Sequence, residues 1–176
     1  QSPGDCFDCA IEAARIASGG VALTYFEFGT LAALEVFLTA QVDVLILEVG
    51  LGGRLDAVNV YDPDCAIVTG IALDHTDWPG VTRDEIASEK AGIFRSGKPA
   101  VCADPSPPQA LITRAQAIGA DLHLLGRDFG YQSDETQWTF WTRGGLRRAG
   151  LAKPGLRGAY QLRSASAALT AVELLR

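Results

Sequence analysis

A lysine on an apolar helix face has the most unusual surroundings of any reactive side chain in this sequence. In a helix expected from Thr82 to about Arg95, a turn of 100° per residue places Ile86, Lys90 and Ile93 on one face. A buried ammonium without a partner costs several kcal/mol, so Lys90 must reach water, form an ion pair or lose its proton. Two interpretations stay open. Lys90 reaches solvent or a salt bridge, or it is a desolvated amine with a depressed pKa, available for reaction or modification.

An acid and a histidine follow two predicted strands. Glu48 ends one apolar run and His75 comes directly after the next. Open α/β sheets bind ligands at the carboxyl ends of their strands, so both groups could face one crevice. With a further anion, which Asp74 or Asp77 could supply, they could hold Mg²⁺, an ion that prefers oxygen ligands and keeps several waters.

Glycines 50, 52 and 53 come shortly after Glu48. Glycines after a buried strand let the backbone turn sharply and approach a ligand. Their spacing is not the G-x-G-x-x-G of dinucleotide-binding loops, so an ordinary strand-to-helix loop is the alternative.

The elements that must position these residues alternate between strands and helices. Apolar runs predict buried strands at 42–49, 65–72, 99–103 and 121–125. Two helices are expected before the first strand, one at about 2–18 and one that follows Phe28 and runs to about Ala40. Two more are expected between later strands, at 82–95 and 108–119. Such alternation indicates βαβ units and a parallel sheet.

After Arg127 the pattern changes. Aromatic residues among polar ones and a Gly144-Gly145 turn predict two or three antiparallel strands, followed by an amphipathic helix at 161–176. The predicted fold is therefore α/β: a mostly parallel sheet flanked by helices, with a small antiparallel β subdomain near residues 127–160.

The composition excludes several classes of function. The chain has 176 residues, 48% of them hydrophobic and 20% charged, which is typical of one globular domain. Its net charge of −6 argues against binding to nucleic acid or to an anionic membrane surface. No apolar run approaches the roughly 20 residues of a membrane span, and we find no signal peptide.

Four cysteines are present, and Cys6 and Cys9 have C-x-x-C spacing. Because no second pair or histidine completes a zinc site, we expect small, reduced side chains and a cytoplasmic protein. The sequence begins at Gln1 and contains no methionine, so we expect it to be a piece of a larger protein.

Three motifs resemble the folylpolyglutamate synthase/dihydrofolate synthase family, ATP-dependent ligases related to the Mur enzymes of peptidoglycan synthesis. They occur in the family's order, at matching separations: Glu48-Val-Gly-Leu-Gly-Gly-Arg-Leu-Asp-Ala, Leu73-Asp-His-Thr-Asp-Trp and Ser88-Glu-Lys-Ala-Gly-Ile-Phe-Arg. The resemblance covers essentially the whole chain. The resemblance implies the central-domain fold of a Mur ligase.

The resemblance assigns metal-binding and catalytic roles. It implies that Glu48 and His75 bind Mg²⁺ and that Lys90 is carbamylated. A carbamate would explain a lysine on an apolar face, because a neutral amine takes up CO₂ and becomes an anion that suits a metal site. Lys90 and His75 are the expected catalytic residues, and Glu48, His75 and Lys90 the expected metal ligands.

Four residues are implied to contact a pterin. The segment from Thr24 to Phe28 resembles one that helps bifunctional bacterial members hold dihydropteroate, through Thr24 and Phe26. Asp56 and Ala57 join them from the glycine loop. The alternative for Thr24 is a helix cap, and for Phe26 a core aromatic.

The sequence departs from the family in three ways. Ser164 stands where the family usually has Asn, the phosphate-binding loop of G-x-x-G-K-[ST] type is absent, and so is the C-terminal domain. Residues 1–160 are therefore expected to be an incomplete ATPase or central domain, with 126–160 its antiparallel part. Residues 161–176 would begin the linker or the C-terminal domain. The chain alone is expected to be inactive.

The expected reaction of the parent enzyme uses ATP to phosphorylate the carboxylate of dihydropteroate or a folate. The amine of L-glutamate then attacks the acyl phosphate. A monomeric parent is expected, with small-molecule substrates, Mg²⁺, and neither nucleic-acid nor membrane partners. The alternatives are a Mur-type ligase acting on a UDP-muramyl peptide and a non-catalytic α/β binding domain.

Overall fold

The computed structural model describes residues 9, 11–13, 15–17, 19, 21–72, 82–156, 158 and 160–176. It divides into two compact units, the first formed by residues 1–51 and 55–61 and the second by residues 52–54 and 62–176. Among the described residues, no helix combines the length and the apolar character needed to cross a membrane.

The first unit is built around helix α2, Tyr25–Ala40. A reciprocal capping box starts it. The Glu27 amide donates to Thr24 Oγ1 at 3.3 Å, and the Thr24 amide donates to Glu27 Oε2 at 2.7 Å. Gln41, in the left-handed region, ends it. A short 3₁₀ helix, η1, follows at Ala57–Val60. The described residues of the first predicted helix, 9, 11–13 and 15–17, are helical.

The prediction of a strand at 42–49 is wrong. These residues form no strand, and they make no backbone–backbone hydrogen bond with another described residue. Val44 is 73% exposed and Ile46 is 88% exposed. An apolar, β-branched run has the residue types of a buried strand, but a strand also needs a second strand beside it to complete its hydrogen bonds. The sequence pattern contains no information about that neighbour.

The second unit contains a three-stranded parallel sheet, which confirms the predicted α/β class. Its strands are β1 (Ala66–Val68), β2 (Pro99–Cys102) and β3 (Asp121–Leu124), in that spatial order. Between β1 and β2 lie helix α3 (Arg83–Lys90) and the 3₁₀ turn η2 (Ala91–Ile93). Helix α4 (Gln109–Ile118) connects β2 to β3.

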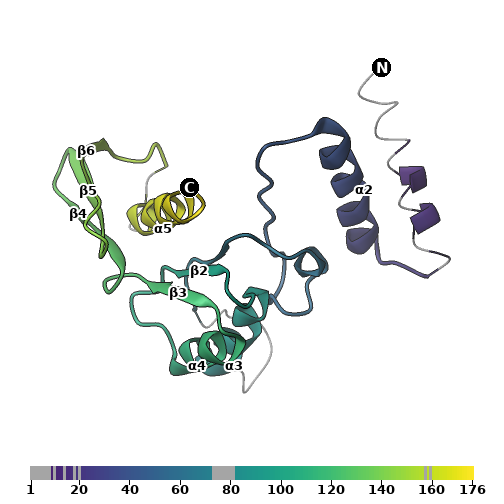
Figure 1. Ribbon diagram of the computed structural model, residues 1–176, viewed down its shortest axis with the longest axis horizontal. Coiled ribbons are helices and arrows are strands. Elements are labelled where there is room, and N and C mark those ends of the chain that lie inside the picture. Colours follow the sequence, from purple (N-terminus) through teal and green to yellow (C-terminus); the bar gives the residue numbers. More distant parts are fainter. Residues whose placement is uncertain are drawn as a thin grey trace. The chain divides into compact units, whose positions relative to one another are not determined.

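Strand β2 is buried on both faces. Ala100 and Cys102 belong to the core cluster formed with α3 and α4, whereas Val101 belongs to the cluster formed with the antiparallel strands and α5. Figure 1 shows α3 and α4 together on one side of β2 and β3. This two-sided burial explains why the β2 sequence reads as a continuous apolar run.

The predicted antiparallel strands are also present. They form a sheet of β4 (Phe129–Ser133), β5 (Gln137–Thr142) and β6 (Arg147–Ala152), and helix α5 (Gln161–Leu174) packs against β4 and β2. Gly130 is required here, because a Cβ would lie 2.8 Å from Cε2 of the Trp141 indole.

Candidate functional site

The part of the glycine loop that belongs to the second unit, Gly52–Arg54, packs directly on the end of helix α3. A Cβ on Gly53 would lie 2.7 Å from the Glu89 carbonyl oxygen and 3.0 Å from the Lys90 Cα, so only glycine fits without a shift. The Arg54 amide donates to the Glu89 carbonyl at 3.0 Å. On the other side, a Cβ on Gly92 would lie 2.7 Å from the Arg54 Cα. The first and third sequence motifs therefore interlock through their backbones.

Lys90 is the last residue of α3 and is half-buried. Its helix neighbours Ile86 and Ala87 pack into the core cluster, which confirms that it lies beside an apolar face. The adjacent Glu89 carboxylate forms an ion pair with Arg54, whose Nε donates to it at 3.0 Å. The Lys90 amine has no ion pair or hydrogen bond with any residue that the structure describes. A salt bridge to Glu89 is therefore not how this lysine is accommodated.

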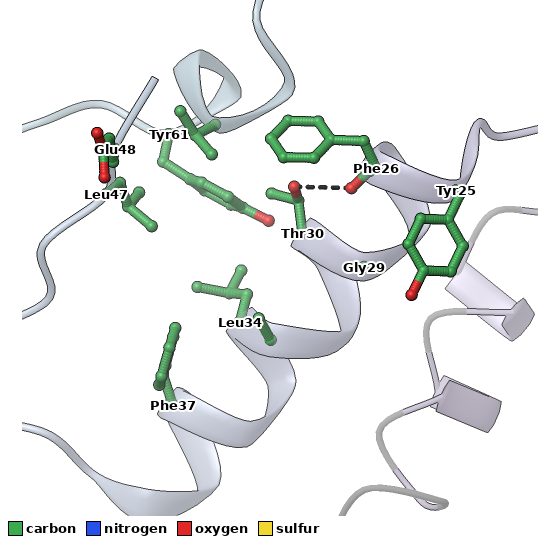
Figure 2. Close-up of a pocket in the computed structure, with 11 residues that line it drawn as sticks. Tyr25, Phe26, Gly29, Thr30, Leu34, Phe37, Leu47, Glu48 and Tyr61 are labelled. Atoms are coloured by element: carbon green, nitrogen blue, oxygen red, sulfur yellow. Dashed lines mark hydrogen bonds between the residues drawn. The ribbon is translucent and has the colours of Figure 1, made fainter. Parts of the chain in front are cut away.

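A cavity of about 300 Å³ lies in the first unit, between α2, the segment at 47–48 and the η1 region (Figure 2). Most of its lining is apolar or aromatic, and Glu48 supplies the carboxylate: Tyr25, Phe26, Gly29, Thr30, Ala33, Leu34, Phe37, Leu47, Glu48, Val58 and Tyr61. Phe26 is 50% exposed, so it is not the core aromatic of the alternative interpretation. Glu48 is exposed and has no ion pair or hydrogen bond with another described residue.

Asp56 organises the loop beside this cavity. Its Oδ2 accepts hydrogen bonds from the amides of Gly50 and Leu51, both at 3.0 Å, and its Oδ1 accepts one from the Val58 amide at 3.0 Å. The last bond caps η1, whose first residue is Ala57. A Cβ on Gly50 would lie 3.6 Å from Asp56 Oδ2 and 3.7 Å from Phe26 Cζ, so Phe26 and Asp56 flank the same backbone turn.

Sequence reasoning missed part of this cavity. Thr30, Leu34 and Phe37 continue the helix face of Phe26 at spacings of three and four residues, a pattern that could have been recognised. Tyr61 had no sequence signal. Burial raises the pKa of its phenol, and the nearby Glu35 carboxylate adds to that effect.

The predicted metal ligands lie in separate parts of the structure. Glu48 belongs to the first unit and Lys90 to the second, and His75 lies outside the described residues. Within the described part of the chain, no three His, Cys, Asp or Glu side chains are grouped to hold a metal ion. The donor chemistry nevertheless fits Mg²⁺, because the Glu48 carboxylate has no described partner and carbamylation would turn the Lys90 amine into an oxygen donor.

No protein-family model matches the chain. Among curated proteins, the dihydrofolate synthase/folylpolyglutamate synthase of Escherichia coli strain K12 is 55% identical over 130 residues, which is 74% of this chain and 30% of that protein. The corresponding Haemophilus influenzae protein is 47% identical over 116 residues, 66% of this chain and 26% of that protein. The chain thus spans less than a third of these relatives.

Solved structures match nearly the whole chain. Escherichia coli FolC in complex with DHPP and ADP superimposes with a TM-score of 0.89 at 44% identity, covering 99% of this chain and 41% of that one. A bifunctional folylpolyglutamate synthase/dihydrofolate synthase with Mn, AMPPNP and L-glutamate bound gives a TM-score of 0.87 at 43% identity, covering 96% of this chain and 40% of that one.

Proposed function

The chain belongs to the dihydrofolate synthase/folylpolyglutamate synthase family, and we propose that the full-length protein is an ATP-dependent ligase that joins L-glutamate to dihydropteroate, to folates or to both. The observation that carries the proposal is the packing of Gly53 and Arg54 on Glu89 and Lys90, which brings two separate sequence motifs together. The ligands of the similar structures, DHPP, ADP, AMPPNP, Mn and L-glutamate, support the substrate classes.

The proposed reaction has two steps. A carboxylate oxygen of the pterin substrate attacks the γ-phosphorus of ATP, and ADP leaves. The neutral amine of L-glutamate then attacks the carbonyl carbon of the acyl phosphate, inorganic phosphate leaves, and loss of the amine proton gives the amide. The protein's own contribution is to position the two reacting groups and to stabilise the negative charge that develops.

The pterin would occupy the cavity of the first unit. Phe26 offers an aromatic face at its edge, and the Asp56 carboxylate lies on the other side of the Gly50 turn. Since Asp56 already accepts three backbone hydrogen bonds, it would hold the loop in shape while presenting its remaining lone pair to the ligand. Thr24, the N-cap of α2, and Ala57, the first residue of η1, would also contact the pterin.

Lys90 would act as a carbamate. Its half-buried amine makes no ion pair or hydrogen bond with a residue that the structure describes, so it is not tied up in a described contact. The nitrogen lone pair bonds to the carbon of CO₂ and a proton passes to water, leaving an N-carboxylate anion. That carbamate, Glu48 and His75 would hold Mg²⁺. Bound there, Mg²⁺ would stabilise charge on the transferring phosphoryl group and on the tetrahedral intermediate.

We also propose the wider context of the site. Residues 1–160 would be the central, ATPase-type part of the enzyme, with 126–160 its antiparallel portion, and residues 161–176 would lead toward a C-terminal domain. The enzyme would be a cytoplasmic monomer, and the unpaired, partly or fully buried Cys65 and Cys102 thiols support a reducing compartment.

Isothermal titration of the full-length protein separates this proposal from its nearest competitor. We expect binding of dihydropteroate in the presence of ATP analogue and Mg²⁺, together with glutamate-dependent phosphate release in a turnover assay. Binding of a UDP-muramyl peptide and not of dihydropteroate would replace the proposal with a Mur-type ligase. Binding without any phosphate release would indicate a non-catalytic domain.

A further inference from the structure

The antiparallel sheet and the helix after it belong to a part of the chain whose charge is opposite to that of the rest. Residues 127–176 contain eight Lys or Arg and four Asp or Glu, a net charge of +4, whereas the whole chain carries −6. The first 126 residues therefore carry −10. A positive region attracts anions, while the negative charge of the remaining chain repels a long polyanion such as nucleic acid. This distribution favours a short anionic ligand.

Three exposed arginines lie at one end of the antiparallel sheet, inside the second unit. Arg127 lies two residues before β4, Arg143 comes directly after β5, and Arg147 is the first residue of β6. Strand pairing brings these positions to the same end, because Trp141, next to the last residue of β5, pairs with Gly130 and with Arg147.

One carboxylate holds two of these arginines side by side. Arg127 Nη2 lies 2.6 Å from Asp128 Oδ2, and Arg143 Nη1 lies 3.8 Å from Asp128 Oδ1. A single carboxylate cannot neutralise two guanidinium groups, so a positive charge remains. The Arg143 side chain is 77% exposed, and its guanidinium makes no hydrogen bond with a residue that the structure describes. Its N–H donors are therefore available to a ligand.

Arg147 and its cross-strand neighbour Trp141 add further unused donors. The Arg147 guanidinium forms neither an ion pair nor a hydrogen bond within the described part of the chain. The half-buried Trp141 ring lies against Gly130, where a Cβ would be 2.5 Å from Cζ2 of the indole. The other tryptophan of β5, Trp138, donates its indole N–H to the Ala152 carbonyl at 2.9 Å. The Trp141 N–H has no such acceptor among the described residues.

These groups suit a short chain that carries several carboxylates. A guanidinium donates two parallel hydrogen bonds to one carboxylate, and several arginines can bind successive carboxylates of the same chain. An indole offers an apolar surface to the methylene groups between them and an N–H to a carboxylate or amide oxygen. The proposed ligase makes such a chain itself, because each glutamate that it joins to a folate replaces one carboxylate with two.

We propose that Arg143, Arg147 and Trp141, with Arg127 beside them, bind the glutamyl tail of a folate that already carries several glutamates. This inference rests on the proposed function, which supplies the oligocarboxylate. The site would hold the tail of the substrate or product and take no part in the chemistry. The reaction with dihydropteroate, which has no glutamyl tail, would not use it.

The test titrates the full-length protein, without nucleotide, with γ-linked tetraglutamate, which has the carboxylates but no pterin. We expect Arg143→Gln and Arg147→Gln each to raise its Kd about two- to fivefold, and the double variant to raise it about tenfold, with kcat and KM for dihydropteroate unchanged. The matched control is Arg114→Gln on α4. Arg114 is exposed and has no described partner, so its loss should leave the Kd unchanged.

Nitrogen-15 NMR of the indole groups gives a second readout that needs no charge change. Tetraglutamate should shift the Trp141 N–H resonance, assigned by its loss in Trp141→Phe, and leave that of Trp138 in place. No binding to the wild-type protein, wild-type affinity in the double variant, or binding without a shift at Trp141 would overturn the inference. So would tripolyphosphate that binds the same residues as tightly, since that marks a general anion patch. Absence of ligase activity in the wild-type protein would instead contradict the proposed function.

Discussion

Gly53 lies so close to Lys90 that only a glycine fits: a Cβ at position 53 would be 3.0 Å from the Lys90 Cα and 2.7 Å from the neighbouring Glu89 carbonyl oxygen. The glycine loop therefore serves as a packing surface for the end of helix α3. Arg54 adds two hydrogen bonds to Glu89, one from its backbone and one from its side chain. Together these contacts fix the backbone from which the Lys90 side chain projects.

Replacing Gly53 with alanine should disturb this contact. The new methyl group has to displace backbone atoms of α3, a kind of overpacking that costs about 1–3 kcal/mol of unfolding free energy. We expect ligase activity to fall more than stability alone explains, because Lys90 moves with the helix end. Denaturant unfolding and steady-state kinetics measure the two effects. Gly155→Ala is the control, since a Cβ there meets nothing within 4 Å.

Lys90→Ala in the full-length protein should abolish ligase activity. A short carboxylate such as acetate should restore part of it, because it can replace the anion that the proposed carbamate would supply. Lys98→Ala is the matched control. Lys98 forms an exposed ion pair with Asp64, and such pairs contribute about 1 kcal/mol or less. Wild-type rates in Lys90→Ala would contradict the carbamate role.

Phe26→Ala should weaken pterin binding without affecting ATP. Loss of an aromatic contact at the cavity costs about 1 kcal/mol or more, which is at least a fivefold rise in the Kd for dihydropteroate. Titration calorimetry with dihydropteroate and, separately, with an ATP analogue measures both affinities. Leu38→Ala, on the same helix but 62% exposed and outside the cavity lining, should change neither. An equal loss of affinity in both variants would place the pterin elsewhere.

The second unit should lose the stability that ionised Asp128 contributes as the pH falls into the acid range. Burial alone would raise the pKa of this carboxyl, but hydrogen bonds from Arg127 and from the Leu124 amide outweigh it and lower the pKa overall. A depressed folded-state pKa contributes stability above the unfolded value and loses it as pH falls through the folded value. Asp128→Asn should therefore be less stable than wild type at pH 7, and this difference should shrink below about pH 4. A difference that is the same at both pH values would show that the charge is not responsible.

Local signals in the sequence predicted much of the fold. The capping-box residues Thr82 and Glu85 start α3 as expected, and the buried runs at β2 and β3 form parallel strands. The apolar run at 42–49 does not form the predicted strand. Its residue pattern suits a strand, but a strand forms only where a second strand lies beside it, and the pattern does not show that. Helix α3 is also shorter than expected, since the chain turns to 3₁₀ geometry at Ala91.

The candidate site was predictable in its residue types but not in its contacts. Lys90 could be recognised because charge on an apolar stripe is locally unusual. The packing of Gly53 on Lys90 could not, because it joins segments that are far apart in the sequence.

Carbon-13 NMR of the full-length protein, equilibrated with ¹³C-labelled bicarbonate and Mg²⁺, detects a carbamate at Lys90 directly. We expect one carbamate carbon resonance in the wild-type protein, absent in Lys90→Ala and retained in Lys98→Ala. A wild-type spectrum without that resonance, under conditions in which the enzyme ligates glutamate, would contradict a carbamate at Lys90, and so would a resonance that survives in Lys90→Ala.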